Sequence, residues 1–280
     1  MKDWIEQNNI TEIECIVPDL AGAARGKIMP ASKFLQSIDS RLPLSIFMQG
    51  ITGDYPEDIF NELNPTDEDM LLKPDPATIR MVPWVSEDPV AQVIHDCVDK
   101  QGQPIDMAPR QVLKNVLALD AERGWKPLVA PELEFYLIQP NPDPDQIIEP
   151  PAGRNGRIER GGQAYSIDAV NEFDPVLDDI YDYCEAHDIA IDAVIHEDGT
   201  AQMEINLLHG DPLDLADQAF LFKRTVREAA LRNQMYATFM AKPMQDQPGS
   251  AMHIHQSVVS METGENLFST PQGKPNELLL

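Results

Sequence analysis

The positions of proline constrain this chain more than any other feature of the sequence. There are 24 prolines in 280 residues. Proline lacks a backbone N–H and fits neither a helix interior nor a central strand, so it marks where elements begin and end. Before residue 105, prolines and acidic turns, including the stretch 53–70, separate short β-forming runs. Beyond residue 105, longer helical patterns alternate with strands. We therefore expect an α+β protein with domains at 1–105 and 106–280.

The charge balance excludes several classes of partner. The chain carries 21 Lys and Arg against 47 Asp and Glu, a formal net charge of −26. Such a surface repels phosphate backbones and anionic lipid headgroups, so we expect neither a nucleic acid nor a membrane as partner. No apolar run approaches the ~18 residues of a membrane span, and the first residues lack the apolar stretch of a signal peptide. We expect a cytoplasmic protein.

The cysteines indicate neither a disulfide framework nor a zinc site. Cys15, Cys97 and Cys184 are odd in number, far apart and outside any CxxC pair. We interpret all three as small buried residues.

Three helices and one long loop are predicted in the second half of the chain. A helical stripe of apolar residues predicts a helix over 109–124, and Asp-Pro pairs predict helix starts for 175–187 and for 212–238. The stretch 139–163 is too rich in proline, glycine and charge to pack, and is predicted to be a long surface loop.

The segment 128–138 predicts a strand with two carboxylates on one face. Side chains alternate in a strand, so Leu133 and Phe135 point to one side while Glu132 and Glu134 point to the other. The two carboxylates then lie about 7 Å apart, at ~3.4 Å per residue. They repel each other unless a cation lies beside them. The alternative is the solvent-facing polar side of an edge strand.

Two further segments present polar side chains in the same way. The turn at Asp198-Gly199 places Glu197 at the mouth of a hairpin, and Glu204 shares one face of the returning strand with Gln202 and Asn206. In the stretch 249–257 the side chains of His253, His255 and Ser257 point one way, and those of Met252 and Ile254 point the other.

Together these three strands present four carboxylates and two imidazoles. If their polar faces converge, the site is too negative to exist without bound cations, and oxygen-rich ligands with one or two nitrogens suit Mg²⁺ or Mn²⁺. Such ions commonly bind nucleotide phosphates. The chain has neither a P-loop motif nor a kinase-type glycine loop, so any bound ATP is held without a glycine-rich cradle.

Three blocks at these strands carry a family resemblance. The sequences PELEF at 131–135, HEDGTAQMEIN at 196–206 and KPMQDQPGSAMHIHQS at 242–257 resemble successive signature blocks of the glutamine synthetase family. The stretch 21–30 resembles that family's N-terminal β-grasp motif. The resemblance implies a β-grasp domain followed by a catalytic domain with an antiparallel curved sheet and flanking helices. The run 209–244 looks closest to the branch that joins glutamate to putrescine.

The resemblance also implies roles for individual residues. Glu134, Glu197 and Glu204 are implied to bind a metal ion next to the glutamate substrate, and Glu132 and His253 to bind one next to the ATP phosphates. His255 and Ser257 are implied to lie along the nucleotide, with Gly249 contacting glutamate through its backbone. The implied cofactors are two or more Mg²⁺ or Mn²⁺ ions, with ATP as substrate. The implied partners are glutamate, ATP and an amine, and the complete protein is expected to form a homo-oligomeric ring.

The chain departs from the family pattern in three places. Family members continue well beyond the point that matches Leu280, so we expect a fragment, inactive alone, that exposes a sheet edge and apolar surface. Gln49 stands where ammonia-using members carry an aspartate that binds and deprotonates ammonium, with Asp54 nearby, which suits a larger amine. Pro248 replaces an asparagine before Gly249.

Four functions compete on this basis. The leading hypothesis is an ATP-dependent glutamate–amine ligase that forms γ-glutamylputrescine through a γ-glutamyl phosphate. The alternatives are a glutamine synthetase that uses ammonia, a non-catalytic member of the family, and an unrelated acidic α+β binding protein.

Overall fold

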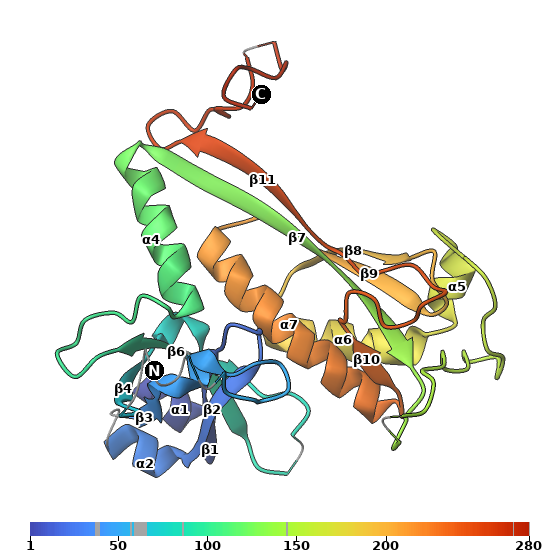
Figure 1. Cartoon of the computed structure of the whole chain (residues 1–280), viewed down its shortest axis with the longest axis horizontal. Coiled ribbons are helices and arrows are strands. Elements are labelled where there is room, and N and C mark those ends of the chain that lie inside the picture. Colours follow the sequence, from blue (N-terminus) through green and yellow to red (C-terminus); the bar gives the residue numbers. More distant parts are fainter. Residues whose placement is uncertain are drawn as a thin grey trace. The chain divides into compact units, whose positions relative to one another are not determined.

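The computed structural model of the chain describes residues 1–36, 40–56, 58, 66–85, 87–143, 145–270 and 272–279. It divides into two compact units, Met1–Arg123 and Gly124–Leu280, and each unit contains its own sheet (Figure 1). The mixture of strands and helices confirms the α+β class. The boundary predicted near residue 105 and the β-grasp assignment of the first domain stay predictions. Part of the acidic stretch at 53–70 lies outside the described residues.

Unit 1 is built on a six-stranded sheet in the order β2–β1–β6–β4–β3, with β5 also pairing with β6. β1 runs parallel to β6, and the other pairs are antiparallel. The elements are α1 (Lys2–Gln7), β1 (Glu12–Pro18), β2 (Ala24–Pro30), α2 (Ala31–Gln36), β3 (Ser40–Pro43), η1 (Leu44–Met48), β4 (Asp69–Pro74), η2 (Pro76–Thr78), β5 (Arg80–Met81), β6 (Val90–Val98) and α4 (Pro109–Glu122).

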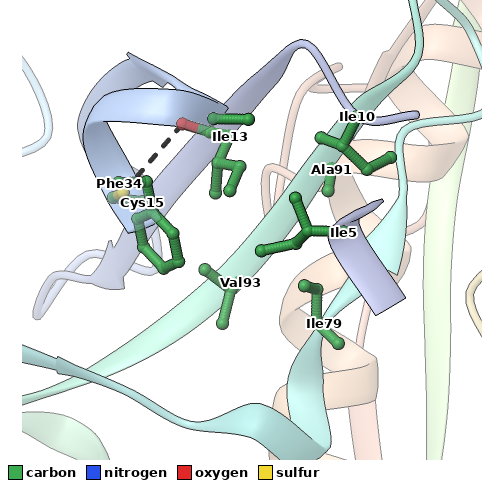
Figure 2. Packing of buried hydrophobic residues seen from close by; sticks show 9 residues of the cluster. Ile5, Ile10, Ile13, Cys15, Phe34, Ile79, Ala91 and Val93 are labelled. Atoms are coloured by element: carbon green, nitrogen blue, oxygen red, sulfur yellow. Dashed lines mark hydrogen bonds between the residues drawn. The ribbon is translucent and has the colours of Figure 1, made fainter. Parts of the chain in front are cut away.

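An apolar cluster joins this sheet to the first two helices (Figure 2). Ile5 of α1, Ile13 of β1, Phe34 of α2 and Val93 of β6 are buried there. Cys15 lies on the same face of β1 as Ile13, because side chains two residues apart in a strand point the same way. Burying this apolar surface stabilises the unit.

All three cysteines are buried and free, as the sequence predicts. Burial raises the pKa of the Cys15 thiol to about 11 and those of Cys97 and Cys184 to about 12. The thiols are therefore protonated and unreactive at neutral pH.

The start of α4 is held by a buried arginine. The Arg110 guanidinium lies 2.7 Å from an Asp75 carboxylate oxygen and 2.6 Å from one of Asp96. Lys114, one turn further along, lies 2.5 Å from the other oxygen of Asp96. Partial burial raises the pKa of Asp75, but hydrogen bonds from Arg110 and from the Ala77 N–H, together with the charges of Arg110 and Lys114, outweigh it, so the pKa is lowered overall.

Unit 2 is built on a five-stranded antiparallel sheet in the order β10–β7–β9–β8, with β11 also pairing with β7. β7 and β11 run side by side, as Figure 1 shows, and their register pairs nine residues of each strand. The elements are β7 (Trp125–Ile138), α5 (Ile167–Asn171), α6 (Asp174–Ala186), β8 (Ile191–His196), β9 (Gln202–Leu207), α7 (Pro212–Arg232), β10 (Tyr236–Thr238) and β11 (Met252–Ser260).

The predicted helices are present, with one error at an end. α4 and α6 agree with the predictions to within two residues, and the side chain of Asp211 caps α7 by accepting from the N–H groups of Leu213 and Asp214. The prediction that the last helix extends to 238 is wrong. Gln234 has a φ of 57°, which no helix continues through, and residues 236–238 pair with β7 as β10.

An aromatic cluster joins the sheet of unit 2 to α7. The ring of Phe239 lies 5.3 Å from that of Phe135 on β7 and 6.3 Å from that of Phe222 on α7, between centroids. Phe135 and Phe222 are fully buried. The apolar side of β7 is thereby packed, which leaves its other side for polar residues.

Within the described part of the chain, none of the helices combines the length and the apolar character that a membrane span requires.

The Arg110→Met substitution tests the ion pairs at α4. Removing the guanidinium leaves the carboxylates of Asp75 and Asp96 without their shared partner. Both are about a quarter exposed, so the expected effect is at the lower end of the range for buried ion pairs. We expect the free energy of unfolding at pH 7 to fall by about 3 kcal/mol. Because the pKa of Asp75 is lowered in the folded protein, the charged form of Asp75 stabilises the fold, and this stabilisation is fully present above the ordinary aspartate pKa. It is lost as the pH falls through the lowered value, so the difference between variant and parent shrinks in acid.

Urea denaturation between pH 3 and 7 measures this effect. Arg41→Met, on the exposed face of β3, is the matched control and is expected to change stability by less than about 0.5 kcal/mol. Equal effects of the two substitutions would contradict the role given to Arg110.

Candidate metal centre

The registers of three strands bring the predicted acidic residues onto one sheet face. Glu134 of β7 is paired with Glu204 of β9, and Glu132 of β7 is paired with Asn206 of β9. On the opposite edge of β7, Glu132 is paired with His253 of β11. Directly paired residues point to the same face, so these side chains form two adjacent rows across the sheet.

Three of these side chains come close enough to share one ion. Glu132, Glu204 and His253 each offer a ligand atom, and these atoms lie within 4.8 Å of one another. The Nδ1 atom of His253 lies 3.5 Å from Glu132 Oε2 and 4.0 Å from Glu134 Oε1. The Nε2 atom of His255 lies 3.0 Å from Glu132 Oε1. Of these three residues, Glu204 belongs to one predicted ligand group, and Glu132 and His253 belong to the other. The predicted division of the ligands between two ions therefore stays a prediction.

The apolar side chains between these acids point the other way. Leu133 and Phe135 of β7 and Met203 and Ile205 of β9 are all at most 2% exposed. This agrees with the alternation predicted for both strands and explains why the carboxylates cannot turn inward. Each acid is held on the polar face by the burial of its neighbours in the chain.

β11 differs from the other two strands. In the described part of the chain it pairs with no strand other than β7. Its apolar residues Met252 and Ile254 alternate with the histidines as predicted, yet they are 53% and 58% exposed. The sequence pattern alone does not show this, because alternation predicts which side a residue takes but not what covers that side.

Burial and neighbouring carboxylates raise the pKa of Glu204 and that of Glu197. Burial is the largest cause of the raised pKa of Glu204, and the other three glutamates of the cluster raise it further. Burial, followed by the charge of Glu134, also raises the pKa of Glu197. The charges of Glu132, Glu134 and Glu197 therefore all act on Glu204, as expected for one cluster.

Glu134 is oriented by hydrogen bonds to one of its two oxygens. Its Oε2 accepts from the Ala251 N–H at 3.0 Å and from Gln202 Nε2 at 3.2 Å, while its Oε1 faces His253. Glu134 is 8% exposed. One oxygen is thus engaged by the protein, and the other is directed at the cluster.

Gln202 and Tyr136 hold the two loops that border the cluster, a role that no sequence pattern indicates. Gln202 Nε2 donates to the carbonyl of Gly249 at 3.0 Å, and its Oε1 accepts from the Gly199 N–H at 3.0 Å. The Tyr136 hydroxyl donates to the carbonyl of Pro248 at 2.7 Å. A Cβ at residue 199 would overlap both Tyr136 Oη and Gln202 Oε1, so only glycine fits there.

Glu197 follows the last residue of β8, at the predicted hairpin mouth. Its neighbour His196 is fully buried, with Nδ1 donating to the carbonyl of Glu197 at 2.7 Å and Nε2 lying 3.1 Å from Glu159 Oε2. Burial lowers the pKa of His196, but these two hydrogen bonds outweigh it and the pKa is raised. Glu159 comes from the long loop and was not predicted to take part.

The four remaining predicted site residues are spread over three parts of the chain. Ser257 pairs with Leu128, further along β11 from His255, and Gly249 lies in the loop before β11. Gln49 and Asp54 belong to unit 1, where Gln49 Nε2 lies 2.5 Å from the Tyr55 hydroxyl. The roles assigned to these residues stay predictions.

The donor set fits a hard divalent cation. It consists of carboxylate oxygens with one imidazole, and no described cysteine joins it. Mg²⁺ and Mn²⁺ prefer such ligands, whereas zinc sites generally use more histidine and cysteine. The raised carboxylate pKa values indicate an excess of negative charge that a bound cation relieves.

Comparison with known proteins gives a match over most of unit 2 and the end of unit 1. The family model described as glutamine synthetase, catalytic domain, matches residues 106–279. The solved structure described as apo GmaS without ligand aligns with a TM-score of 0.78 and 27% sequence identity, over 99% of this chain and 60% of that chain.

Two curated relatives act on amines, according to their names. The gamma-glutamylputrescine synthetase PuuA of Escherichia coli (strain K12) is 34% identical over 288 residues, which cover 100% of this chain and 60% of that protein. The glutamate–isopropylamine ligase of Pseudomonas sp is 30% identical over 277 residues, covering 97% of this chain and 59% of that protein. The chain spans about 60% of the length of these relatives.

The Glu204→Gln substitution tests the electrostatics of the cluster. The raised pKa means that the charged form of Glu204 destabilises the folded state at neutral pH, and that this penalty disappears as the pH falls below the raised value. We expect the variant to be more stable than the parent at pH 7 without metal, by about 1 kcal/mol. We also expect it to lose most of the stabilisation by Mn²⁺, which for the parent is about 2.7 kcal/mol at one hundred times the dissociation constant.

Urea denaturation with and without Mn²⁺ measures both effects. Glu185→Gln, at an exposed position of α6, removes the same charge away from the cluster and is expected to leave both quantities unchanged. A metal-free Glu204→Gln variant that is less stable than the parent at pH 7 would contradict the account.

Proposed function

The chain belongs to the glutamine synthetase family, and from this premise we propose that its acidic sheet face supports the ATP-dependent joining of the glutamate side-chain carboxylate to an amine. The observation that carries the proposal is the convergence of Glu132, Glu204 and His253 from three neighbouring strands, with Glu134 paired beside them. A solvated polar face does not require carboxylates to be buried against one another at the cost of raised pKa values.

The residues take distinct roles in this proposal. Glu134, Glu197 and Glu204 bind a divalent ion beside the glutamate substrate, and Glu132 and His253 bind one beside the ATP phosphates. Divalent cations held there supply positive charge that offsets the charge on the phosphoryl oxygens. His255 and Ser257 lie along the nucleotide. The loop before β11, fixed by Gln202, presents the backbone of Gly249 to glutamate.

The reaction proceeds in two steps. A side-chain carboxylate oxygen of glutamate attacks the γ-phosphorus of ATP, the bond from that phosphorus to the bridging oxygen breaks, and ADP leaves. The amine nitrogen then attacks the carbonyl carbon of the resulting acyl phosphate, phosphate leaves, and the nitrogen loses a proton. The first step replaces a poor leaving group by a good one, which is why ATP is required.

The proposed amine is larger than ammonia, with putrescine as the leading candidate. The two curated relatives described above carry names that specify putrescine and isopropylamine. Gln49 is neutral where ammonia-using members are expected to carry an aspartate. We further propose a cytoplasmic protein whose complete form assembles as a homo-oligomeric ring.

A coupled assay of the product of the complete reading frame tests this function. With glutamate, ATP and Mn²⁺ present, we expect phosphate release with putrescine at a kcat/KM at least ten times that with ammonium, a difference of about 1.4 kcal/mol in transition-state stabilisation. Mass spectrometry identifies the γ-glutamyl product. Glu134→Gln is expected to lower kcat at least a hundredfold, and Glu185→Gln is expected to leave it unchanged.

The other outcomes separate the rival functions. A preference for ammonium would identify a glutamine synthetase. Absence of turnover with every amine, together with absence of Mn²⁺ binding, would identify a non-catalytic member of the family.

A further inference from the structure

Glu159 lies in the long loop between β7 and α5, and its side chain is only 15% exposed. A single oxygen, Oε2, contacts two groups: the ring nitrogen Nε2 of His196 at 3.1 Å and the backbone N–H of Ala201 at 2.7 Å. His196 directly precedes Glu197, and Ala201 follows it by four residues. One carboxylate therefore contacts both ends of the segment 196–201, which carries Glu197.

The contact through His196 continues to the backbone of Glu197. The imidazole is fully buried, and its Nδ1 donates to the carbonyl oxygen of Glu197 at 2.7 Å. The N–H of Glu197 donates to the carbonyl of Gln202 at 2.8 Å. The peptide groups on both sides of Glu197 are thereby fixed, so the direction in which its side chain leaves the backbone is fixed as well.

The contact at Ala201 stabilises a backbone conformation that few residues other than glycine adopt. Ala201 has a φ of 53°, in the left-handed region, and is fully buried. That conformation is unfavourable for a residue with a Cβ, so it persists only where its surroundings impose it. The carboxylate of Glu159, which accepts the Ala201 N–H, is part of those surroundings and turns the chain from Glu197 back into β9.

We propose that Glu159 is a positioning residue for the metal centre, which acts through His196 and Ala201 to direct the carboxylate of Glu197 toward the other acids of the cluster. This inference rests on the proposed function, because it assumes that the cluster binds a divalent ion. It assigns a role to a loop whose described residues provide no ligand to the cluster. Residues that orient a metal ligand from behind commonly change metal affinity 10- to 100-fold when they are removed.

Calorimetric titration of the chain with Mn²⁺ tests the proposal. We expect Glu159→Ala to weaken Mn²⁺ binding about 10- to 100-fold. Glu159→Gln keeps an oxygen that can accept the Ala201 N–H but loses the charge opposite His196, so a smaller weakening is expected. Glu149→Gln removes a carboxylate from the same loop and is expected to leave the affinity unchanged. Urea denaturation without metal shows whether each variant is folded. If Glu159→Ala does not fold, the Mn²⁺ affinity of Glu159→Gln is compared with that of the parent instead.

A double substitution separates positioning from a general loss of structure. If Glu159 acts through Glu197, then adding Glu159→Ala to a Glu197→Gln variant changes the Mn²⁺ dissociation constant less than twofold. The proposal is overturned if Glu159→Ala alone changes the affinity less than twofold, or if it weakens binding equally with and without Glu197. Failure of the unmodified chain to bind Mn²⁺ overturns this inference, whereas the coupled assay of the complete reading frame decides the proposed function.

Discussion

The repulsion among the carboxylates of one sheet face determines the rest of the site. Glu134 and Glu204 are paired across two strands and are each less than a tenth exposed, so water screens their charges poorly. Neither can turn away, because the residues on either side of each are packed in the core. The fold therefore maintains an electrostatic cost that only a cation or a proton relieves. Such a cost is typical of a site that is built to bind, since a purely structural surface has no reason to keep it.

Two uncharged side chains, Gln202 and Tyr136, contribute to fixing the loops around the cluster. Gln202 contacts Glu134, the turn at Gly199 and the carbonyl of Gly249, so one amide links a ligand, the hairpin and the loop before β11. Tyr136 reinforces the same loop through Pro248. Burial is the largest cause that raises the pKa of Tyr136 to about 12, with the charge of Glu134 second, so its hydroxyl remains a hydrogen-bond donor at neutral pH.

Much of the site could be predicted from the sequence because strand periodicity is a local property. The alternation of Leu133 and Phe135 with Glu132 and Glu134 fixes which side each residue takes, and the register then places them opposite β9 and β11. The helix start at Asp211 was predictable for the same reason, since a cap involves residues two and three positions apart. The oxygen-rich ligand set indicated Mg²⁺ or Mn²⁺, and the family resemblance supplied the expected division of the ligands between two ions.

What the sequence missed depends on contacts between distant residues. Glu159 lies 37 positions from His196 in a stretch whose composition predicts only a surface loop, and no periodic pattern marks it. The end of α7 was placed too late because the pairing of residues 236–238 with β7 competes with helical propensity, and such competition has no local signal. The exposure of Met252 and Ile254 is not visible in the alternation of β11, but it agrees with the expectation that the chain exposes a sheet edge and apolar surface.

The three buried thiols have a practical consequence for spectroscopy. Each native cysteine is at most 4% exposed, so a thiol-specific reagent added to the folded chain at neutral pH has no native target. A single cysteine introduced on an exposed loop can therefore carry a spin label or fluorophore without removal of Cys15, Cys97 or Cys184. Paramagnetic relaxation between such a label and bound Mn²⁺ then gives the distance from any chosen surface point to the ion.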